Sequence, residues 1–291
     1  MNIFLSTQNI PVVEVRDELF EQKGIKLFVK RDDLIHPFLS GNKWRKLRYN
    51  IEEMMRQKKN VILTFGGAYS NHILATAAAG KEFGFSTIGI IRGEEPEEKN
   101  HVLRQAIALG MKLHFISRAQ YRMKHTEAFL INLKEGFEDF YLVPEGGANE
   151  SGVRGCAEII SELKMDYTHI CCCCGTGTTL AGIARSMPSG KKAIGICVHK
   201  GGASVLENLI QWTSGNDNFE VINDYHFGGY AKSNDELKRY SERFSAETGI
   251  PVEPVYTAKM FYGIYDLAKR NYFGRGSVLI ALHTGGIHNQ L

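Results

Sequence analysis

Glycine and threonine dominate the short segment 174–179, which reads Cys-Gly-Thr-Gly-Thr-Thr. It lies between a predicted strand and a predicted helix, so its backbone N–H groups and hydroxyls can converge on a phosphate at the positive end of that helix. The segment lacks the lysine of a nucleotide-binding P-loop and the third spaced glycine of a dinucleotide fingerprint. It therefore predicts a cup for a small phosphorylated cofactor, although such a turn can also be purely structural.

Lys43 is a second candidate, in the segment 40–47 that reads Ser-Gly-Asn-Lys-Trp-Arg-Lys-Leu. A flexible turn leads directly into a predicted helix, so Lys43 falls in the first helical turn. The helix dipole and the desolvation of a pocket both disfavour an ammonium there. A neutral lysine amine is the nucleophile that forms a Schiff base with an aldehyde. Taken alone, a lysine such as Lys43 is more often a solvated surface residue.

The amine and the cup together match the needs of one cofactor. Pyridoxal 5'-phosphate has a phosphate that needs such a cup and an aldehyde that needs such a lysine. The combination therefore predicts pyridoxal 5'-phosphate, whereas ATP and NAD would need motifs that the chain lacks.

Strands and helices alternate along the whole chain. Short apolar runs bounded by turn residues predict strands at 27–30, 61–65, 87–91, 112–116, 140–143, 169–173, 192–198 and 277–282. Amphipathic segments predict helices at 44–57, 70–83, 98–109, 152–163, 179–186, 234–248 and 259–269. This alternation predicts an α/β fold with parallel sheets. Glycine-rich turns after several strands would face one crevice, as ligand-binding turns do in such folds.

The composition is that of an ordinary globular protein. The 291 residues are 43% hydrophobic and 23% charged, with a net charge of +3 that is too small to indicate nucleic acid or an anionic membrane surface as partner. No apolar run is long enough for a membrane span, and the start lacks the pattern of a signal peptide. We therefore expect a cytoplasmic protein that acts on a small molecule.

The cysteines, histidines and aspartates do not have the spacing of metal ligands. Cys171 to Cys174 are consecutive, so a strand would send them alternately to opposite faces, and we expect buried, reduced thiols. Asp32 and Asp33 would likewise point to opposite faces of a strand, which favours capping and ion pairs. The histidines lack the spacing of a zinc site, and we predict no metal.

Several motifs, in order along nearly the whole chain, resemble one family. They are 40–47, Tyr69-Ser-Asn-His72, Gly175–Thr179, Gly229-Tyr230, Glu253-Pro-Val-Tyr-Thr-Ala-Lys259 and His283-Thr-Gly-Gly286. The sequence is similar to the 1-aminocyclopropane-1-carboxylate (ACC) deaminase/D-cysteine desulfhydrase family of tryptophan-synthase-β-type, pyridoxal-phosphate-dependent enzymes. The resemblance implies fold type II, with a large domain of residues 1–46 and 153–291, a small inserted domain of 47–152, and a homodimer.

The resemblance also implies a role for individual residues. Lys43 would hold the cofactor and move protons, Asn71 would bond the cofactor's phenolic oxygen, and Thr284 would face its ring nitrogen. Ser70, with the amides around Asn71 and His72, would take the substrate carboxylate. Tyr230 and Tyr256 would flank the substrate as stacking and acid/base groups. The phosphate would be held by Gly175, Thr176, Gly177, Thr178 and Thr179.

The expected substrate follows from the surroundings of the ring nitrogen. ACC deaminases have a glutamate after the second tyrosine, where this chain has Thr257, and threonines at both Thr257 and Thr284 resemble the desulfhydrases. Opening a cyclopropane without an α-proton demands a strong electron sink, whereas elimination of a β-thiol demands less. We therefore expect D-cysteine to be converted into pyruvate, sulfide and ammonia. The alternatives are ACC deamination to 2-oxobutanoate and ammonia, and a non-catalytic ligand-binding protein of the same fold.

Overall fold

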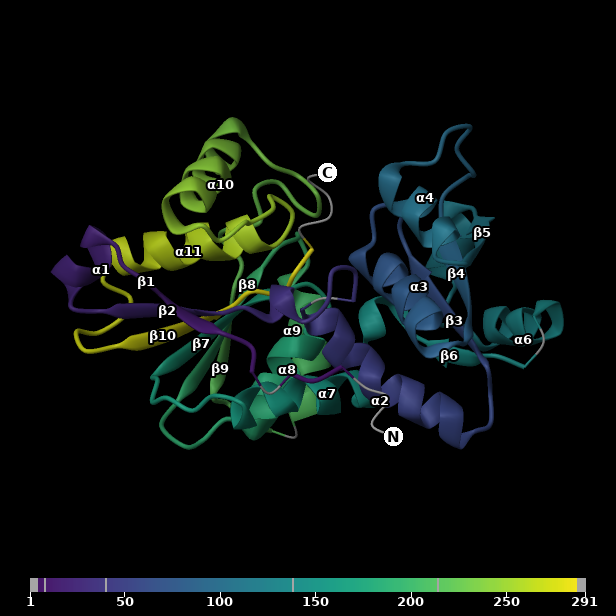
Figure 1. Ribbon diagram of the computed structural model, residues 1–291, viewed down its shortest axis with the longest axis horizontal. Coiled ribbons are helices and arrows are strands. Elements are labelled where there is room, and N and C mark those ends of the chain that lie inside the picture. Colours follow the sequence, from purple (N-terminus) through teal and green to yellow (C-terminus); the bar gives the residue numbers. More distant parts are fainter. Residues whose placement is uncertain (1–4, 8, 40, 138, 214, 287–291) are drawn as a thin grey trace.

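The computed structural model describes residues 5–7, 9–39, 41–137, 139–213 and 215–286, and its strands form two separate sheets that lie side by side (Figure 1). The larger sheet has the order β1 (Val12–Val15), β2 (Lys26–Lys30), β10 (Val278–Leu282), β7 (His169–Cys174), β8 (Lys192–Cys197) and β9 (Phe219–Ile222). The smaller sheet has the order β5 (Lys112–Ile116), β4 (Ser86–Arg92), β3 (Val61–Gly66) and β6 (Tyr141–Val143). All described pairings are parallel except the one between β1 and β2.

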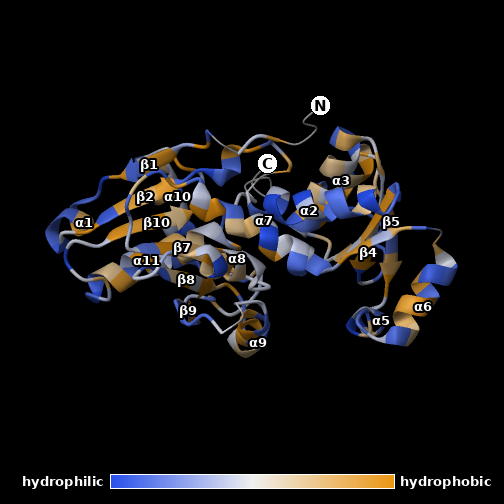
Figure 2. Cartoon of the chain, turned by 90° about the horizontal axis from the view of Figure 1, so that it is seen from below, coloured by the Kyte–Doolittle hydropathy of each residue, from blue (hydrophilic) through white to orange (hydrophobic). Residues whose placement is uncertain are grey.

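Helices cover both faces of each sheet, and buried apolar side chains of the strands and helices pack together between them. Hydrophobic residues, coloured orange in Figure 2, run along strands such as β2 and β10. One face of the larger sheet packs on α1 (Glu18–Lys23), α10 (Asp235–Thr248) and α11 (Thr257–Lys269), and the other on α7 (Glu150–Ser161), α8 (Thr178–Ser186) and α9 (Gly202–Thr213). The smaller sheet packs on α2 (Asn42–Arg56), α3 (Asn71–Phe83) and α4 (His101–Ala108) on one side, and on α5 (Arg118–Arg122) and α6 (Glu127–Gly136) on the other. Short 3-10 turns η1 (Asp32–Leu34) and η2 (Glu145–Gly147) complete the described elements.

This architecture confirms the predicted α/β class, and every predicted strand and helix is present with ends shifted by a few residues. Six further elements were not predicted, because most of them are too short to show a clear period; they are β1, β9, α1, α5, α6 and α9. The domain boundaries at 46/47 and 152/153 stay a prediction. Among the described residues, no helix is long and apolar enough to cross a membrane.

The buried-thiol prediction for β7 is confirmed. Cys171 and Cys173 belong to the apolar cluster on the α10–α11 face, and Cys172 and Cys174 to the cluster on the α7–α8 face. All are free and buried. Strand alternation therefore divides the thiols between two cores, and it leaves Cys173 close to the end of the strand that leads into the loop 175–177.

The prediction that Asp32 and Asp33 lie in a strand is wrong, because both belong to η1. Their ion-pair role is confirmed. Asp32 accepts hydrogen bonds from Lys30 Nζ at 2.8 Å and from Arg45 Nε and Nη2 at 2.6 and 3.0 Å. Arg45 and Lys30 also reach Glu162, just beyond α7, at 2.7 and 2.8 Å. This buried ion cluster ties α2 to the larger sheet and to α7.

Removing one charge from the buried ion cluster should destabilise the fold. Asp32→Asn leaves Lys30 and Arg45 buried with less compensation, and we expect the free energy of unfolding to fall by about 3–5 kcal/mol. Urea unfolding of the cofactor-free protein measures it. Glu53→Gln is the matched control, because it breaks an exposed pair with Arg56 on the same helix and should leave the urea midpoint unchanged. An Asp32→Asn midpoint equal to that of the control would contradict the prediction.

Candidate active site

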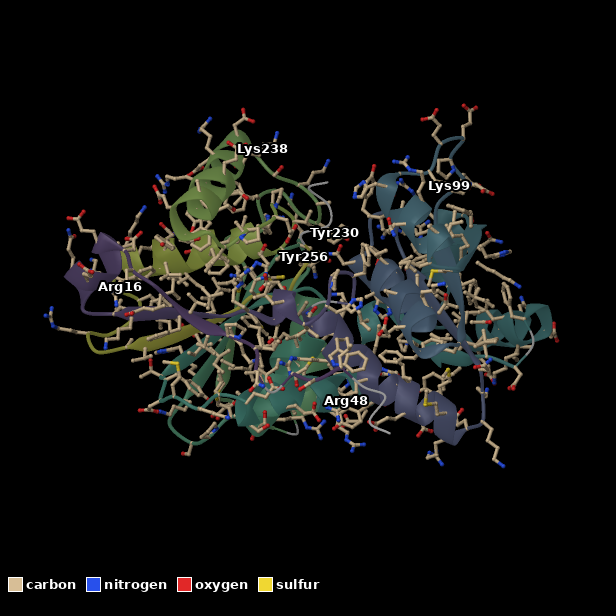
Figure 3. The ribbon with its side chains drawn as sticks, in the orientation of Figure 1. Arg16, Arg48, Lys99, Tyr230, Lys238 and Tyr256 are labelled. Carbon is tan, nitrogen blue, oxygen red and sulfur yellow. The ribbon has the colours of Figure 1, made fainter. Side chains whose placement is uncertain are left out.

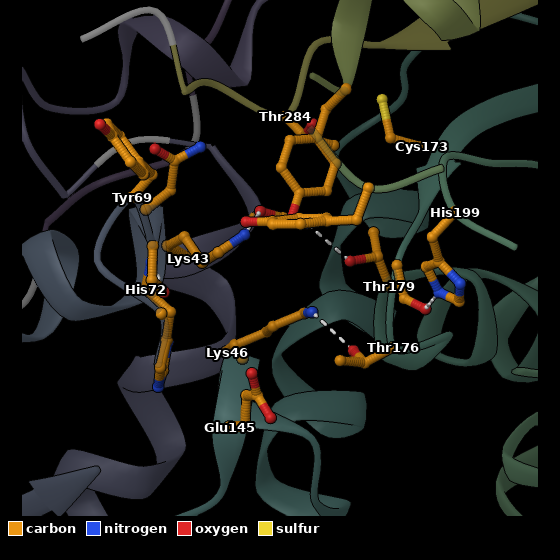
Figure 4. Close-up of a pocket in the computed structure, with 18 of the residues that line it drawn as sticks. Lys43, Lys46, Tyr69, His72, Glu145, Cys173, Thr176, Thr179, His199 and Thr284 are labelled. Atoms are coloured by element: carbon orange, nitrogen blue, oxygen red, sulfur yellow. Dashed lines mark hydrogen bonds between the residues drawn. The ribbon is translucent and has the colours of Figure 1, made fainter. Parts of the chain in front are cut away.

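A cavity of about 350 Å³ lies where the carboxyl ends of strands from both sheets face each other (Figure 4). The loops after β3, β6, β7, β8 and β10 all contribute to its wall, as expected for a ligand site in a parallel α/β fold. The predicted site residues that line it are Lys43, Ser70, Asn71, His72, Gly175, Thr176, Gly177, Thr179, Tyr230, Tyr256 and Thr284. Thr178 is the exception: its side chain is buried, and its hydroxyl pairs with that of Thr176 at 2.9 Å.

Lys43 is held at the start of α2 by a close approach of two backbone segments. Gly41 has a φ of 61°, and a Cβ there would lie 2.0 Å from the carbonyl oxygen of Thr284. Only glycine fits this contact, which brings the first turn of α2 against the end of β10. Lys43 Nζ donates to Asn42 Oδ1 at 2.9 Å and lies 6.0 Å from the centre of the Tyr256 ring.

Burial, reinforced by the nearby ammonium of Lys46, lowers the pKa of Lys43 to about 7. A large fraction of the amine is therefore neutral at physiological pH and nucleophilic. This is the property that an aldehyde cofactor requires of its lysine.

Lys46 is a site residue that the sequence analysis missed. It lies three residues after Lys43, on the same face of α2, and only 4% of it is exposed. Its Nζ is 3.5 Å from Thr176 Oγ1 (dashed in Figure 4), and no described carboxylate forms an ion pair with it. Burial lowers the pKa of the ammonium.

The loop beside Lys46 offers further positive charge. Gly177, at a φ of 86°, caps the start of α8, so the free N–H groups of that helix face the same space. A buried cation opposite the positive end of a helix is unfavourable unless an anion lies between them. The cup therefore fits the phosphate of the predicted cofactor, and the position of Lys46 at i+3 from Lys43 is the sequence signal that could have identified it.

The first turn of α3 forms the opposite wall. Ser70 is its N-cap and accepts from the backbone N–H groups of His72 and Ile73 at 3.2 and 3.4 Å. The Thr64 hydroxyl donates to the Val143 carbonyl at 2.8 Å, so its 2.9 Å contact with His72 must be donated by His72 Nε2. This assigns the tautomer and leaves Nδ1 as a buried acceptor without a partner among the described residues.

Tyr256 and Tyr230 meet at the cavity edge, between the two sheets (Figure 3). Their rings are 5.9 Å apart at 74°, an edge-to-face contact. Tyr256 precedes α11, and the buried carboxylate of Glu253 fixes it by accepting from the N–H groups of Tyr256 and Thr257 at 2.9 and 2.8 Å. Burial raises the pKa of both tyrosines, so both hydroxyls keep their protons at neutral pH.

We expect Thr257 and Thr284 in the surroundings of the ring nitrogen, and this expectation stays a prediction for Thr257. Thr257 is fully buried and does not line the cavity, and its hydroxyl accepts from the Glu253 N–H at 2.9 Å. Thr284 does line the cavity, beside Cys173, as expected. The sequence motif could not show that Thr284 lines the cavity and Thr257 does not, because the hydrogen bonds between Glu253 and Thr257 determine where the Thr257 side chain points.

His199, Arg92 and Glu145 also line the cavity, and the sequence analysis did not predict them. His199 Nε2 lies 2.8 Å from the carbonyl oxygen of Gly175 and so donates to the phosphate loop. Arg92 ends β4, and Glu145 begins η2, where it pairs with Lys124 at 3.3 Å. His199, Arg92 and Glu145 all lie at or just beyond the carboxyl end of a predicted strand, which is the signal that could have identified them.

Comparisons with known proteins agree on one group. The family described as "Pyridoxal-phosphate dependent enzyme" matches residues 3–285. A putative ACC deaminase of Pyrococcus horikoshii is 31% identical over 279 residues, 91% of this chain and 85% of the relative. A bifunctional D-cysteine desulfhydrase/ACC deaminase of Arabidopsis thaliana is 30% identical, over 91% of this chain and 73% of the relative. The crystal structure of an ACC deaminase homologue matches with a TM-score of 0.83 and 28% identity, over 97% of this chain and 91% of the other.

The lowered pKa of Lys43 predicts how its reaction with pyridoxal phosphate depends on pH. The neutral amine reacts, so the rate should rise about tenfold per pH unit up to the pKa of about 7 and then level off. Borohydride trapping followed by mass spectrometry of the Lys43 peptide measures the rate. N-acetyl-lysine in the same buffers corrects for titration of the aldehyde itself, and Lys43→Ala should give no label. A rate that still rises tenfold per unit above pH 8 would contradict the assignment.

Because Lys46 lies beside the loop 175–177, replacing it should weaken the binding of pyridoxal phosphate more than that of pyridoxal. Lys46→Met removes a charged donor, worth roughly 10- to 100-fold in the dissociation constant of pyridoxal phosphate. Pyridoxal, which lacks the phosphate, should lose much less affinity, because only the small effect of Lys46 on the pKa of Lys43 is removed. Equilibrium dialysis measures both ligands, with Arg56→Met, at the exposed end of the same helix, as control. Equal losses for the two ligands would place Lys46 away from the phosphate.

Proposed function

The chain belongs to the ACC deaminase/D-cysteine desulfhydrase family of pyridoxal-phosphate-dependent enzymes, and on that premise we propose that it converts D-cysteine and water into pyruvate, sulfide and ammonia. The family and the fold type predicted from the sequence are thereby confirmed. The choice of substrate rests on one observation: the cavity wall around Thr284 is neutral. Of the described residues, Glu145 is the one carboxylate that lines the cavity, and it comes from the smaller sheet.

A neutral wall favours the elimination reaction. When bound, pyridoxal phosphate withdraws electrons from the α-carbon of an attached amino acid and so makes its α-proton acidic. ACC has no α-proton, and opening its ring needs the stronger electron sink that a carboxylate beside the ring nitrogen supplies. A hydroxyl such as that of Thr284 suffices for loss of a thiol.

Residues of the chain supply the remaining steps. Lys43 Nζ, whose pKa is lowered to about 7, takes the α-proton from the substrate in its neutral form. Ser70 and the N–H groups at the start of α3 bind the substrate carboxylate, since the positive end of a helix attracts an anion. Tyr230 and Tyr256 hold the side chain of the substrate, and one of these protonated hydroxyls gives its proton to the departing sulfur.

The alternative is deamination of ACC to 2-oxobutanoate and ammonia. The names of the two relatives support it as a second candidate, because one is called a putative ACC deaminase and the other is called bifunctional. Both reactions would use the same cavity and the same lysine.

Product analysis separates the two reactions. The holoenzyme should release sulfide and pyruvate in equal amounts from D-cysteine, and no 2-oxobutanoate from ACC. Sulfide is measured as methylene blue, and the two oxo acids by chromatography, with L-cysteine as the stereochemical comparison. Lys43→Ala should abolish turnover, because it removes the amine that moves the proton. Turnover of ACC without turnover of D-cysteine would overturn the proposal.

A further inference from the structure

Lys259 is a buried ammonium outside the cavity. It is the third residue of α11, and none of its surface is exposed. Its Nζ donates to three backbone carbonyls, of Val198 at 3.1 Å and of His226 and Gly229 at 2.9 Å each. All three N–H bonds of the ammonium are therefore used, and each joins α11 to a segment from elsewhere in the chain.

Two of these carbonyls belong to the turn that carries Tyr230. Gly229 N–H donates to the His226 carbonyl at 3.0 Å, which closes the turn immediately before the tyrosine. Phe227, Gly228, Gly229 and Ala231 all have positive φ, of 50°, 91°, 130° and 54°. A backbone in that region is unfavourable for phenylalanine and alanine, so the turn needs external support to persist.

The third carbonyl belongs to Val198, just after β8 and next to His199. His199 in turn donates to the Gly175 carbonyl of the phosphate loop at 2.8 Å. Lys259 thus links the Tyr230 turn to the segment that supports the phosphate loop, and both links start from the helix whose N-cap is Tyr256.

The position of Lys259 is electrostatically unfavourable. An ammonium in the first turn of a helix opposes the dipole, and one removed from water loses its hydration. Burial lowers the pKa of Lys259 to about 8, although the carboxylate of Glu253 favours the charged form. An apolar side chain of similar length would fill the same volume without these costs, so the three carbonyl bonds account for a lysine here.

We propose that Lys259 is a positioning residue that holds Tyr230 against Tyr256 at the cavity edge by clamping the His226 and Gly229 carbonyls. This inference rests on one part of the proposed function, namely that Tyr230 contacts the substrate. It assigns to Lys259 no contact with substrate or cofactor, because Lys259 does not line the cavity. Loss of the clamp lets the turn relax and carries the Tyr230 ring away from its place.

Hydrogen exchange of the holoenzyme tests the clamp without reference to activity. In Lys259→Met, amides of residues 226–232 should exchange at least about tenfold faster, whereas those of α3 should not change. Lys259→Gln, which keeps two donors, should give an intermediate increase and carries the test if the methionine variant does not fold. Lys269→Met, at the exposed end of α11, is the control. Unchanged exchange at 226–232 would overturn the proposal.

A double-mutant cycle tests whether Lys259 acts through Tyr230. In the native background, Lys259→Met should lower kcat/KM about tenfold or more, since a displaced group loses its alignment with the substrate. In a Tyr230→Ala background the same change should cost less than about twofold, because the ring being positioned is already gone. Equal losses in both backgrounds would overturn the proposal. The cycle can be run with D-cysteine or with ACC, so failure of the proposed substrate remains distinguishable from failure of the clamp.

Discussion

Helix α2 carries both lysines that face the cavity, and the buried ion cluster of Lys30, Asp32, Arg45 and Glu162 fixes where that helix lies. The backbones of α2 and α7 also lie in close contact beside this cluster, which glycine permits: a Cβ at Gly155 of α7 would lie 1.8 Å from the Arg45 carbonyl oxygen. Apolar residues on another face of α2 pack on α3 and the smaller sheet. One helix thus contacts both sheets, and any shift of α2 would move Lys43 and Lys46 together.

The electrostatics of the cavity are unbalanced in the protein alone. Lys43 and Lys46 are held in a space that also faces the positive ends of α3 and α8. Lys46 helps to lower the pKa of Lys43, and both lysines help to lower the pKa of His72. An anionic ligand relieves this repulsion, and any ligand that binds only the folded state stabilises it. The same arrangement that prepares a nucleophilic amine therefore makes the fold depend on its cofactor for part of its stability.

The sequence predicted the ligand-binding loops at the ends of strands better than the contacts of buried charged side chains. The loop 175–177 and the turn before Lys43 were predictable because glycine, threonine and an adjacent helix start leave few other conformations. The roles of Lys259 and Glu253 were not predictable, because a buried charge becomes informative only when its partners are known. Thr257 is a similar case. The sequence places it next to Tyr256, but its side chain direction is set by a hydrogen bond with the N–H group of Glu253, four residues earlier. Strand β1 is antiparallel to β2 and does not belong to the strand–helix alternation from which other strands were predicted.

Glu253 explains how a carboxylate can be present beside the cavity and yet leave its wall neutral. Its two oxygens accept from the N–H groups of Val255, Tyr256 and Thr257, at 2.7, 2.9 and 2.8 Å. The donors of Tyr256 and Thr257 are ones that the start of a helix otherwise leaves unpaired, and Val255 immediately precedes them, so the carboxylate finds its hydrogen bonds at the start of α11. Burial nevertheless raises its pKa to about 7, which means that the negative charge is only partly held at neutral pH. The Glu253 carboxylate is thus turned toward the start of α11, whereas Thr284, just beyond β10, lines the cavity.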